Sequence, residues 1–291
     1  MAAQSDAVYY RHDDKTSESV SLKIPDGVTH IAGFKFKDFT KLESVVIPET
    51  VINIGESAFL GCENLKSINI SAKVTVIQRD TFSGCIKLKS IHIPETVTVI
   101  ENGAFHNCKS LESVVIPEKV TSIGDIAFMS CKSLKSVVIP KTVENIGNNA
   151  FSFCISLLSI IIPDGVTTIE DEMFHDCLSL ESVVIPKSIE AIGSQAFNGC
   201  SSLSSVVIPE SVKTIGSFAF VNCAALENIT LPQELTHIAT YTFAGCKSLG
   251  HIFIPEKVTG LGELAFNSCT SLKIIFLGQQ NGGLQKKKRR I

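Results

Sequence analysis

A leucine recurs at intervals of 23 residues along this chain, eleven times without an insertion or deletion. The first of these residues is Leu42 and the last is Leu272. The same interval places all ten cysteines, all ten prolines and eleven of the seventeen phenylalanines. Self-similarity at a fixed period of roughly 20–50 residues indicates a stack of similar structural units. The period therefore constrains the architecture of nearly the whole chain.

The repeat from Leu111 to Ser133, numbered here as positions 1 to 23, shows how one unit is expected to fold. Apolar residues at positions 4 and 6 alternate with outward residues at positions 3 and 5, which is typical of a half-buried strand. Proline at position 7 ends the strand, because it cannot donate a backbone hydrogen bond. Glycine at position 14, present in six of eleven units, is interpreted as a turn residue. Asp125 to Cys131 carries apolar residues at the spacing of one helical turn.

One unit is too small to fold alone. Ordering its backbone costs about 1–2 kcal/mol per residue, and burying its apolar side chains returns only roughly 10–20 kcal/mol. Stacked units cover each other's apolar faces and add ladder hydrogen bonds. The expected fold is an α/β-type, β-rich repeat solenoid, a curved right-handed stack of about 11 coils with a parallel sheet and short 3₁₀ or α turns. We expect the solenoid over residues 19–277, a polar N-terminal cap over 1–18 and a flexible basic tail over 278–291.

The complete unit, L-x-x-I-x-I-P-x-x-V-x-x-I-G-x-x-A-F-x-x-C, resembles the BspA-type subclass of leucine-rich repeats. The resemblance covers about residues 20–277. It implies a leucine-rich-repeat fold and a role in protein binding, adhesion or cell-surface display. The asparagine ladder of most leucine-rich repeats is missing, since position 9 holds residues such as Thr50 and Lys73.

Position 21 holds the ten cysteines and, in the first unit, Phe39. An apolar residue at the same place indicates that the cysteines are small buried side chains of the core. We expect reduced thiols; a disulfide between neighbouring coils is the alternative, since their separation allows one. Reduced cysteines and an N-terminus without an apolar signal region favour an intracellular location, cytoplasmic or nuclear. The cell surface is the alternative.

The sequence contains no catalytic signature. No G-x-S-x-G, P-loop or G-x-G-x-x-G pattern occurs. The seven histidines fall at several repeat positions, which favours surface residues, and the acidic run Glu170 to Glu172 is interpreted as a solvated turn. Because the cysteines have neither CxxC spacing nor histidine partners, no metal site is expected. We therefore expect no enzyme activity, no catalytic residue and no cofactor.

Charge and hydropathy exclude some classes of partner. The net charge is −3, and the five positive charges of Lys286 to Arg290 leave −8 for the rest of the chain. That balance argues against nucleic acid as a partner of the body. No run of 18 apolar residues occurs, so no membrane span is expected. The basic tail itself is interpreted as a solubilising segment, a nuclear-import signal or a contact for anionic lipid or nucleic acid.

Position 5 is the anomaly, because it should face out of the sheet and yet is aliphatic in five consecutive units. Exposed contiguous apolar surface marks a partner site, whereas strand propensity alone also favours valine. Two phenylalanines at this position incline us toward binding, since exposed aromatic rings are costly. The candidate partner-binding residues are Val46, Val115, Val138, Ile161, Val184, Val207, Phe253 and Phe276.

These observations predict a non-enzymatic protein-interaction scaffold that uses the outward strand face. The alternative is a cell-surface, adhesin-like protein that binds ligands. Because residues 278–283 contain no apolar side chain, they cannot cover the coil before them. Self-association through the strand face or through this open coil is therefore also expected, unless the chain is part of a longer repeat protein.

Overall fold

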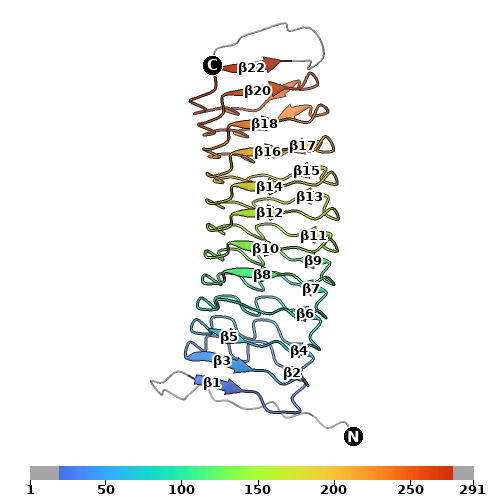
Figure 1. Ribbon diagram of the computed structural model, residues 1–291, viewed down its shortest axis with the longest axis vertical. Coiled ribbons are helices and arrows are strands. Elements are labelled where there is room, and N and C mark those ends of the chain that lie inside the picture. The colour runs from blue at the N-terminus through green and yellow to red at the C-terminus, as the bar shows by residue number, and fades with distance from the viewer. Residues whose placement is uncertain (1–19, 278–291) are drawn as a thin grey trace. The chain divides into compact units, whose positions relative to one another are not determined.

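The computed structural model describes residues 20–277. The chain divides into two compact units, unit 1 (residues 1–150) and unit 2 (residues 151–291), and each is described by itself. Within each unit every 23-residue repeat forms one coil, and the coils are stacked with parallel strands (Figure 1). The predicted β-rich solenoid is confirmed. The predicted polar cap at 1–18 and the basic tail at 278–291 lie outside the described residues.

Positions 1 to 6 of the repeats form the first row of strands. Successive strands pair in parallel, and the outward residues of positions 3 and 5 flank a buried residue at position 4. In unit 1 these strands are β1 (Val20–Lys23), β3 (Leu42–Val46), β5 (Ser67–Ile68), β8 (Ser113–Val115) and β10 (Ser136–Val138). In unit 2 they are β12 (Ser159–Ile161), β14 (Ser182–Val184), β16 (Ser205–Val207), β18 (Asn228–Thr230), β20 (His251–Ile254) and β22 (Ile274–Leu277).

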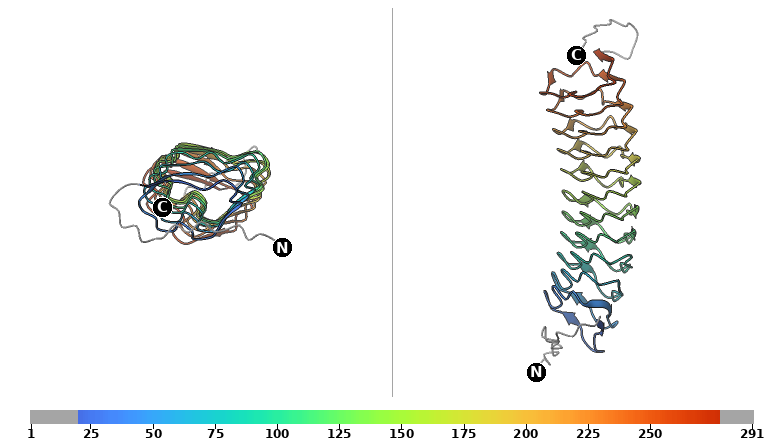
Figure 2. Two further views of the ribbon diagram at one scale, coloured as in Figure 1. Left: turned by 90° about the horizontal axis from the view of Figure 1, so that it is seen from below. Right: turned by 90° about the vertical axis from the view of Figure 1, so that its left-hand side faces the viewer.

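Positions 12 and 13 form a second row of two-residue strands on another side of each coil (Figure 2). Isoleucine at position 13 points into the core in nearly every coil, as in Ile123 and Ile192. In unit 1 the strands are β2 (His30–Ile31), β4 (Asn53–Ile54), β6 (Val76–Ile77), β7 (Val99–Ile100), β9 (Ser122–Ile123) and β11 (Asn145–Ile146). In unit 2 they are β13 (Thr168–Ile169), β15 (Ala191–Ile192), β17 (Thr214–Ile215), β19 (His237–Ile238) and β21 (Gly260–Leu261).

The predicted helical turn at positions 15 to 21 is wrong, since the described residues contain no helix. The segment instead has two residues in the left-handed region, at positions 16 and 20, such as Ile126 (φ 51°) and Ser130 (φ 62°). This backbone turns the N–H groups of positions 16, 18 and 20 toward the next coil. Ile126 N–H donates to Asn148 O at 2.9 Å, and Phe128 N–H donates to Ala150 O at 2.8 Å. A helix would direct these donors along its own coil.

A column of phenylalanine rings from position 18 fills the centre of each unit. Successive rings lie 5.2–5.8 Å apart from Phe36 to Phe128 in unit 1, and 5.2–5.9 Å apart from Phe151 to Phe266 in unit 2. Their planes are nearly parallel, within 17°. Each such aromatic pair contributes about 0.5–1.5 kcal/mol beyond the area it buries. The period therefore brings one ring of every coil into contact with the next.

Glycine at position 14 begins a turn, in which Ala127 N–H donates to Gly124 O at 3.4 Å, and it also permits a close approach between coils. Gly124 has no positive φ. A Cβ at Gly124 would lie 2.3 Å from Asn102 Oδ1 and 2.5 Å from Asn102 N. The same Asn102 oxygen accepts the backbone N–H of Asp125 at 2.9 Å, and Asp125 in turn accepts that of Asn148 at 2.8 Å. Position 15 thus carries a short side-chain ladder, and hydroxyl groups at position 9 also bond the preceding coil, as Thr142 Oγ1 does to Val120 O at 2.8 Å.

We predict that Gly124→Ala destabilises the protein by about 1–3 kcal/mol or more, because backbone atoms of Glu101 and Asn102 occupy the space of the new methyl group. Gly250→Ala is the matched control, since no heavy atom lies within 4 Å of its Cβ position. Urea unfolding followed by circular dichroism gives both free energies. Equal stability of the two variants would contradict this account of position 14.

Candidate functional site

In unit 1 the outward strand face carries the predicted valines in exposed positions. Val46, Val115 and Val138 are 51%, 64% and 58% exposed. Val115 and Val138 lie side by side, because β8 and β10 pair in register, and Ser113 and Ser136 lie beside them in the same way. The result is a small apolar surface bordered by hydroxyl groups.

In unit 2 the same position forms a second apolar surface. Ile161, Val184 and Val207 are 67%, 54% and 77% exposed. Ile161 pairs with Val184 across β12 and β14. Phe253 is 42% exposed, and its ring is nearly perpendicular to that of His251, with the ring centroids 6.1 Å apart. The backbone of Phe276 pairs with that of Phe253, but the Phe276 side chain lies outside the described part of the structure.

Within unit 1 the first row of strands stops between β5 and β8, where residues 88–93 form no strand. In the preceding pair of coils, the side chain of Asn69 replaces a ladder contact between β3 and β5. Its Oδ1 accepts the N–H of Ile47 at 3.0 Å, and its Nδ2 donates to Ile47 O at 2.9 Å. In regular coils the position 6 N–H bonds the backbone of the next coil, as Ile116 does with Val138 O. Val46 is separate from the pair Val115 and Val138, because the two coils between them hold Asn69 and His92 at position 5.

Two exposed leucines of unit 2 were not predicted from the sequence. Leu158 at position 2 and Leu178 at position 22 are 46% and 43% exposed. They lie where the chain enters β12 and β14, so they extend the apolar surface formed by Ile161 and Val184. An alignment of the repeats would have indicated them, because most other units hold a charged or polar residue at these two positions.

The ten cysteines are all free, and all but Cys269 are buried. In nine of them the thiol is seen to donate to the carbonyl oxygen of the phenylalanine 26 residues earlier, at 3.0–3.4 Å, as Cys108 does to Phe82. Burial raises the pKa of Cys62 and of Cys108 from the ordinary 9.0 to about 12. The predicted column of buried thiols is confirmed, and these thiols are poor nucleophiles and poor metal ligands.

Two histidines are more buried than the surface positions predicted for them. His106 Nδ1 lies 3.4 Å from the hydroxyl of Ser83, and burial lowers the pKa of this histidine, while Asp80 opposes the shift. Ser83 is only 5% exposed, so this long contact presents no accessible nucleophile. His175 Nε2 lies 3.4 Å from Asp176 Oδ2, and its ring meets the Phe153 ring edge-on. Among the described residues, no group of three His, Cys, Asp or Glu side chains could hold a metal ion.

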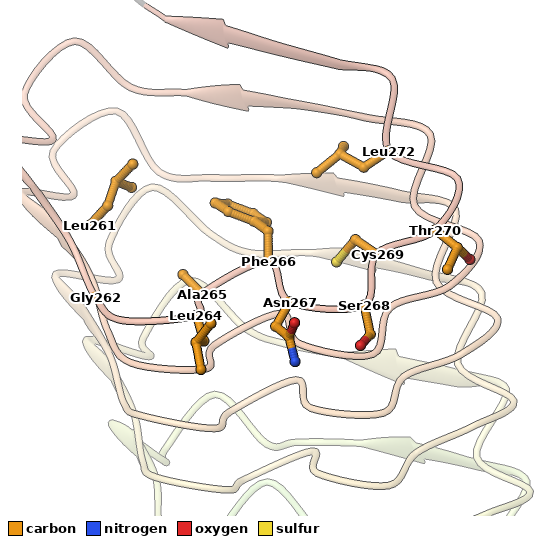
Figure 3. A pocket seen from close by; sticks show the side chains of 10 residues that line it. All are labelled: Leu261, Gly262, Leu264, Ala265, Phe266, Asn267, Ser268, Cys269, Thr270 and Leu272. Carbon is orange, nitrogen blue, oxygen red and sulfur yellow. The ribbon is translucent and has the colours of Figure 1, made fainter. Parts of the chain in front are cut away.

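A cavity of about 510 Å³ lies at the last described coil of unit 2 (Figure 3). Phe266, Cys269 and Leu272 project into it, and Leu261 forms another part of its wall. Leu261 is 56% exposed, although position 13 is buried in the other coils. The lining includes core positions of the repeat, which the next coil covers elsewhere in the unit. Association of copies at this coil stays a prediction.

Within residues 20–277, no helix has the length and apolar composition needed to cross a membrane.

The chain matches the family described as BspA type leucine rich repeat region, in overlapping matches over residues 14–135, 52–180, 121–223 and 167–287. The chain belongs to the BspA-type leucine-rich-repeat family. No curated protein compared with the chain matches it significantly. Proteins of this family are generally involved in protein interaction rather than catalysis.

Solved structures agree with the family and the fold. A leucine-rich repeat protein from Bacteroides ovatus is 31% identical with a TM-score of 0.60, over 88% of this chain and 86% of that one. A leucine rich cell surface protein from Faecalibacterium prausnitzii is 32% identical with a TM-score of 0.62, over 89% of this chain and 82% of that one. A leucine-rich repeat protein from Eubacterium ventriosum, 22% identical with a TM-score of 0.54 over 86% and 82%, shares the fold.

We predict that this BspA-type protein loses stability as the pH rises above 9. A thiol whose pKa is raised on folding stabilises the protein fully below the unfolded pKa of 9.0, and that contribution disappears between 9.0 and about 12. At pH 10 each such thiol costs about 1 kcal/mol. Urea unfolding at pH 8, 9 and 10 under reducing conditions measures the loss. The variant Cys108→Ala should show a smaller pH dependence; an unchanged slope would contradict the assignment.

Proposed function

We propose that the protein is a non-enzymatic protein-interaction scaffold and that the outward strand face is its contact surface. The observation that supports this most directly is the exposure of large aliphatic side chains in register on the outward face of the strands. Val115 and Val138 form this surface in unit 1, and Ile161, Val184 and Val207 form it in unit 2. Apolar surface of this kind on a folded domain is typical of a partner site.

The polar surroundings suit a protein partner. Serine at position 3 lies beside each of these residues and offers hydroxyl donors and acceptors at the border of the apolar surface. An apolar centre with a polar rim is the common composition of protein interfaces. In unit 2, Leu158 and Leu178 enlarge the centre on the side where the chain enters the strands.

We predict that the double variant Val138→Asp and Val184→Asp, one substitution in each unit, weakens partner binding at least tenfold. Burying an uncompensated carboxylate at the centre of an interface costs more than about 1.4 kcal/mol. A partner is first captured from the native source by cross-linking with the wild-type protein, and its affinity for each variant is then measured by calorimetry. Both residues are exposed, so the fold should be kept, which a thermal melt checks.

The control is Ile52→Asp, an aliphatic residue that is 46% exposed at position 11, outside the first row of strands. It makes the same chemical change on another side of the coil. Full affinity in the strand-face variant, or an equal loss in the control, would overturn the proposed surface.

A second candidate function is that of a cell-surface, adhesin-like protein that binds ligands. It is supported by the Faecalibacterium prausnitzii structure, which is described as a cell surface protein and is 32% identical to this chain. The fold and the strand face would serve either role. Biotinylation of intact source cells with a reagent that does not cross membranes separates the two: a surface protein is labelled before lysis, and an internal scaffold only after it.

A further inference from the structure

Six lysines line one edge of the strand face in unit 1. They occupy positions 22, 23 and 2, where the chain enters the first row of strands, on the side where β8 and β10 begin (Figure 1). All six are exposed. We name this set the lysine rim: Lys66, Lys87, Lys89, Lys109, Lys132 and Lys135.

Most ammonium groups of the lysine rim are not paired with a carboxylate, although Glu112 holds position 2 in the coil between those of Lys89 and Lys135. Lys66 Nζ lies 3.0 Å from Glu43 Oε2. The other five ammonium groups form no ion pair within the described residues. Lys109 and Lys132 hold the same position in adjacent coils, which a hydrogen bond of 3.1 Å from Ser133 N–H to Lys109 O connects. Like charges on neighbouring strands are unfavourable by themselves, so an anion would relieve this arrangement.

The lysine rim is a property of unit 1 and not of the repeat. The corresponding positions of unit 2 hold mainly apolar, hydroxyl and acidic residues, among them Ile155, Leu158, Leu178, Ser201 and Ser204. Neither the strand nor the core requires lysine here, because the same backbone bonds form in both units: Lys135 N–H donates to Glu112 O, and Glu181 N–H donates to Leu158 O, both at 2.9 Å. The fold therefore does not restrict the side chain at these positions, and it can serve to recognise a partner.

The apolar strand face lies directly beside this charge. Lys135 is followed by β10, in which Val138 is three residues away, about 10 Å along an extended strand. A ligand running along the coils at this edge could therefore place negative charges against the lysines and apolar groups against Val115 and Val138 at the same time.

We propose that the lysine rim binds an acidic segment of a partner protein, which lies along unit 1 with its apolar side chains on Val115 and Val138. This proposal rests on the proposed function and specifies the partner. Three observations favour a polypeptide over a polysaccharide or nucleic acid. The exposed valines need apolar groups to cover them. Glu63 and Glu112 interrupt the rim and would repel a continuous polyanion. Finally, the rim contains lysine only, whereas arginine is the better fit for phosphate.

The test measures binding of a fluorescein-labelled random copolymer of glutamate and tyrosine to the full chain by fluorescence anisotropy. The variant Lys89→Glu with Lys109→Glu should weaken binding at least tenfold at about 50 mM salt. The affinity of the wild-type protein should be lower at about 150 mM salt than at about 50 mM salt, because salt screens exposed charges. The matched control is Lys119→Glu with Lys141→Glu, which makes the same charge change at exposed positions 9 and 8 of unit 1. It should weaken binding less than threefold. Thermal melts check that both variants are folded.

Several outcomes would overturn the proposal. An equal loss in the rim variant and its control would show a general effect of net charge. Tighter binding of heparin or of duplex DNA than of the copolymer would assign the rim to another class of ligand. Salt-dependent self-association that the rim variant abolishes, measured by light scattering, would make a second copy the occupant.

A further pair of variants separates this proposal from the proposed function. Val115→Ser with Val138→Ser removes the apolar surface without changing the charge. If copolymer binding depends on the lysines and not on the valines, the strand-face function fails in unit 1 and only an anion site remains. If a captured partner depends on the valines while the rim variant keeps full affinity, the rim proposal fails and the strand-face function stands.

Discussion

The backbone hydrogen bonds between the left-handed turns of successive coils are the constraint on which the rest of each unit depends. Two residues per coil adopt positive φ, and most of them are not glycine, as Ile126 and Phe218 show. Such a conformation costs about 1–2 kcal/mol for an ordinary residue. It persists because it presents alternate N–H groups to the next coil, where buried donors without acceptors would cost as much or more. An inserted residue would exchange these donors for carbonyl groups, which accounts for the strict interval of 23 residues.

The sequence predicted the strands and the core well, and it failed where two backbones share one side-chain pattern. Val114 and Ile116 alternate with outward residues, which only a strand produces. The spacing of Phe128 and Cys131 fits a helical turn, but it fits two left-handed turns equally well, since both return the chain to the same face after three residues. Gly124 begins a turn, as its residue type indicates, but its close contact with the preceding coil was not predicted. Only the position of the neighbouring coil decides both points.

The candidate surface was predictable from the sequence, but the strand pairing beneath it was not predictable in every coil. Alternation along the strand suffices to place Val207 outward, and it is 77% exposed. How far the strands of neighbouring coils pair depends on individual side chains. Asn69 takes both backbone groups of Ile47 and replaces a ladder contact between β3 and β5, which no periodicity in the sequence signals. Leu158 and Leu178 were not predicted because they lie outside the strand, at positions where most units hold a charged or polar residue.

Some positions of the repeat hold the coils together and others do not, and only the latter are free to contact a partner. Positions 18 and 21 join successive coils. The phenylalanine ring at position 18 contacts the ring of the neighbouring coil, and its carbonyl oxygen accepts a hydrogen bond from the cysteine thiol at position 21 of the next coil. Cysteine suits that place because it is small, apolar and still a donor. Phe39 holds the corresponding place in the first described coil, where the residue 26 places earlier lies outside the described range. Positions 2, 3 and 22 are not bound in this way, and neither is position 5 apart from Asn69, because coils with different side chains there make the same backbone bonds. Differences between units at these positions, lysine in one and leucine in the other, are therefore not required by the stack, and the proposed recognition uses them.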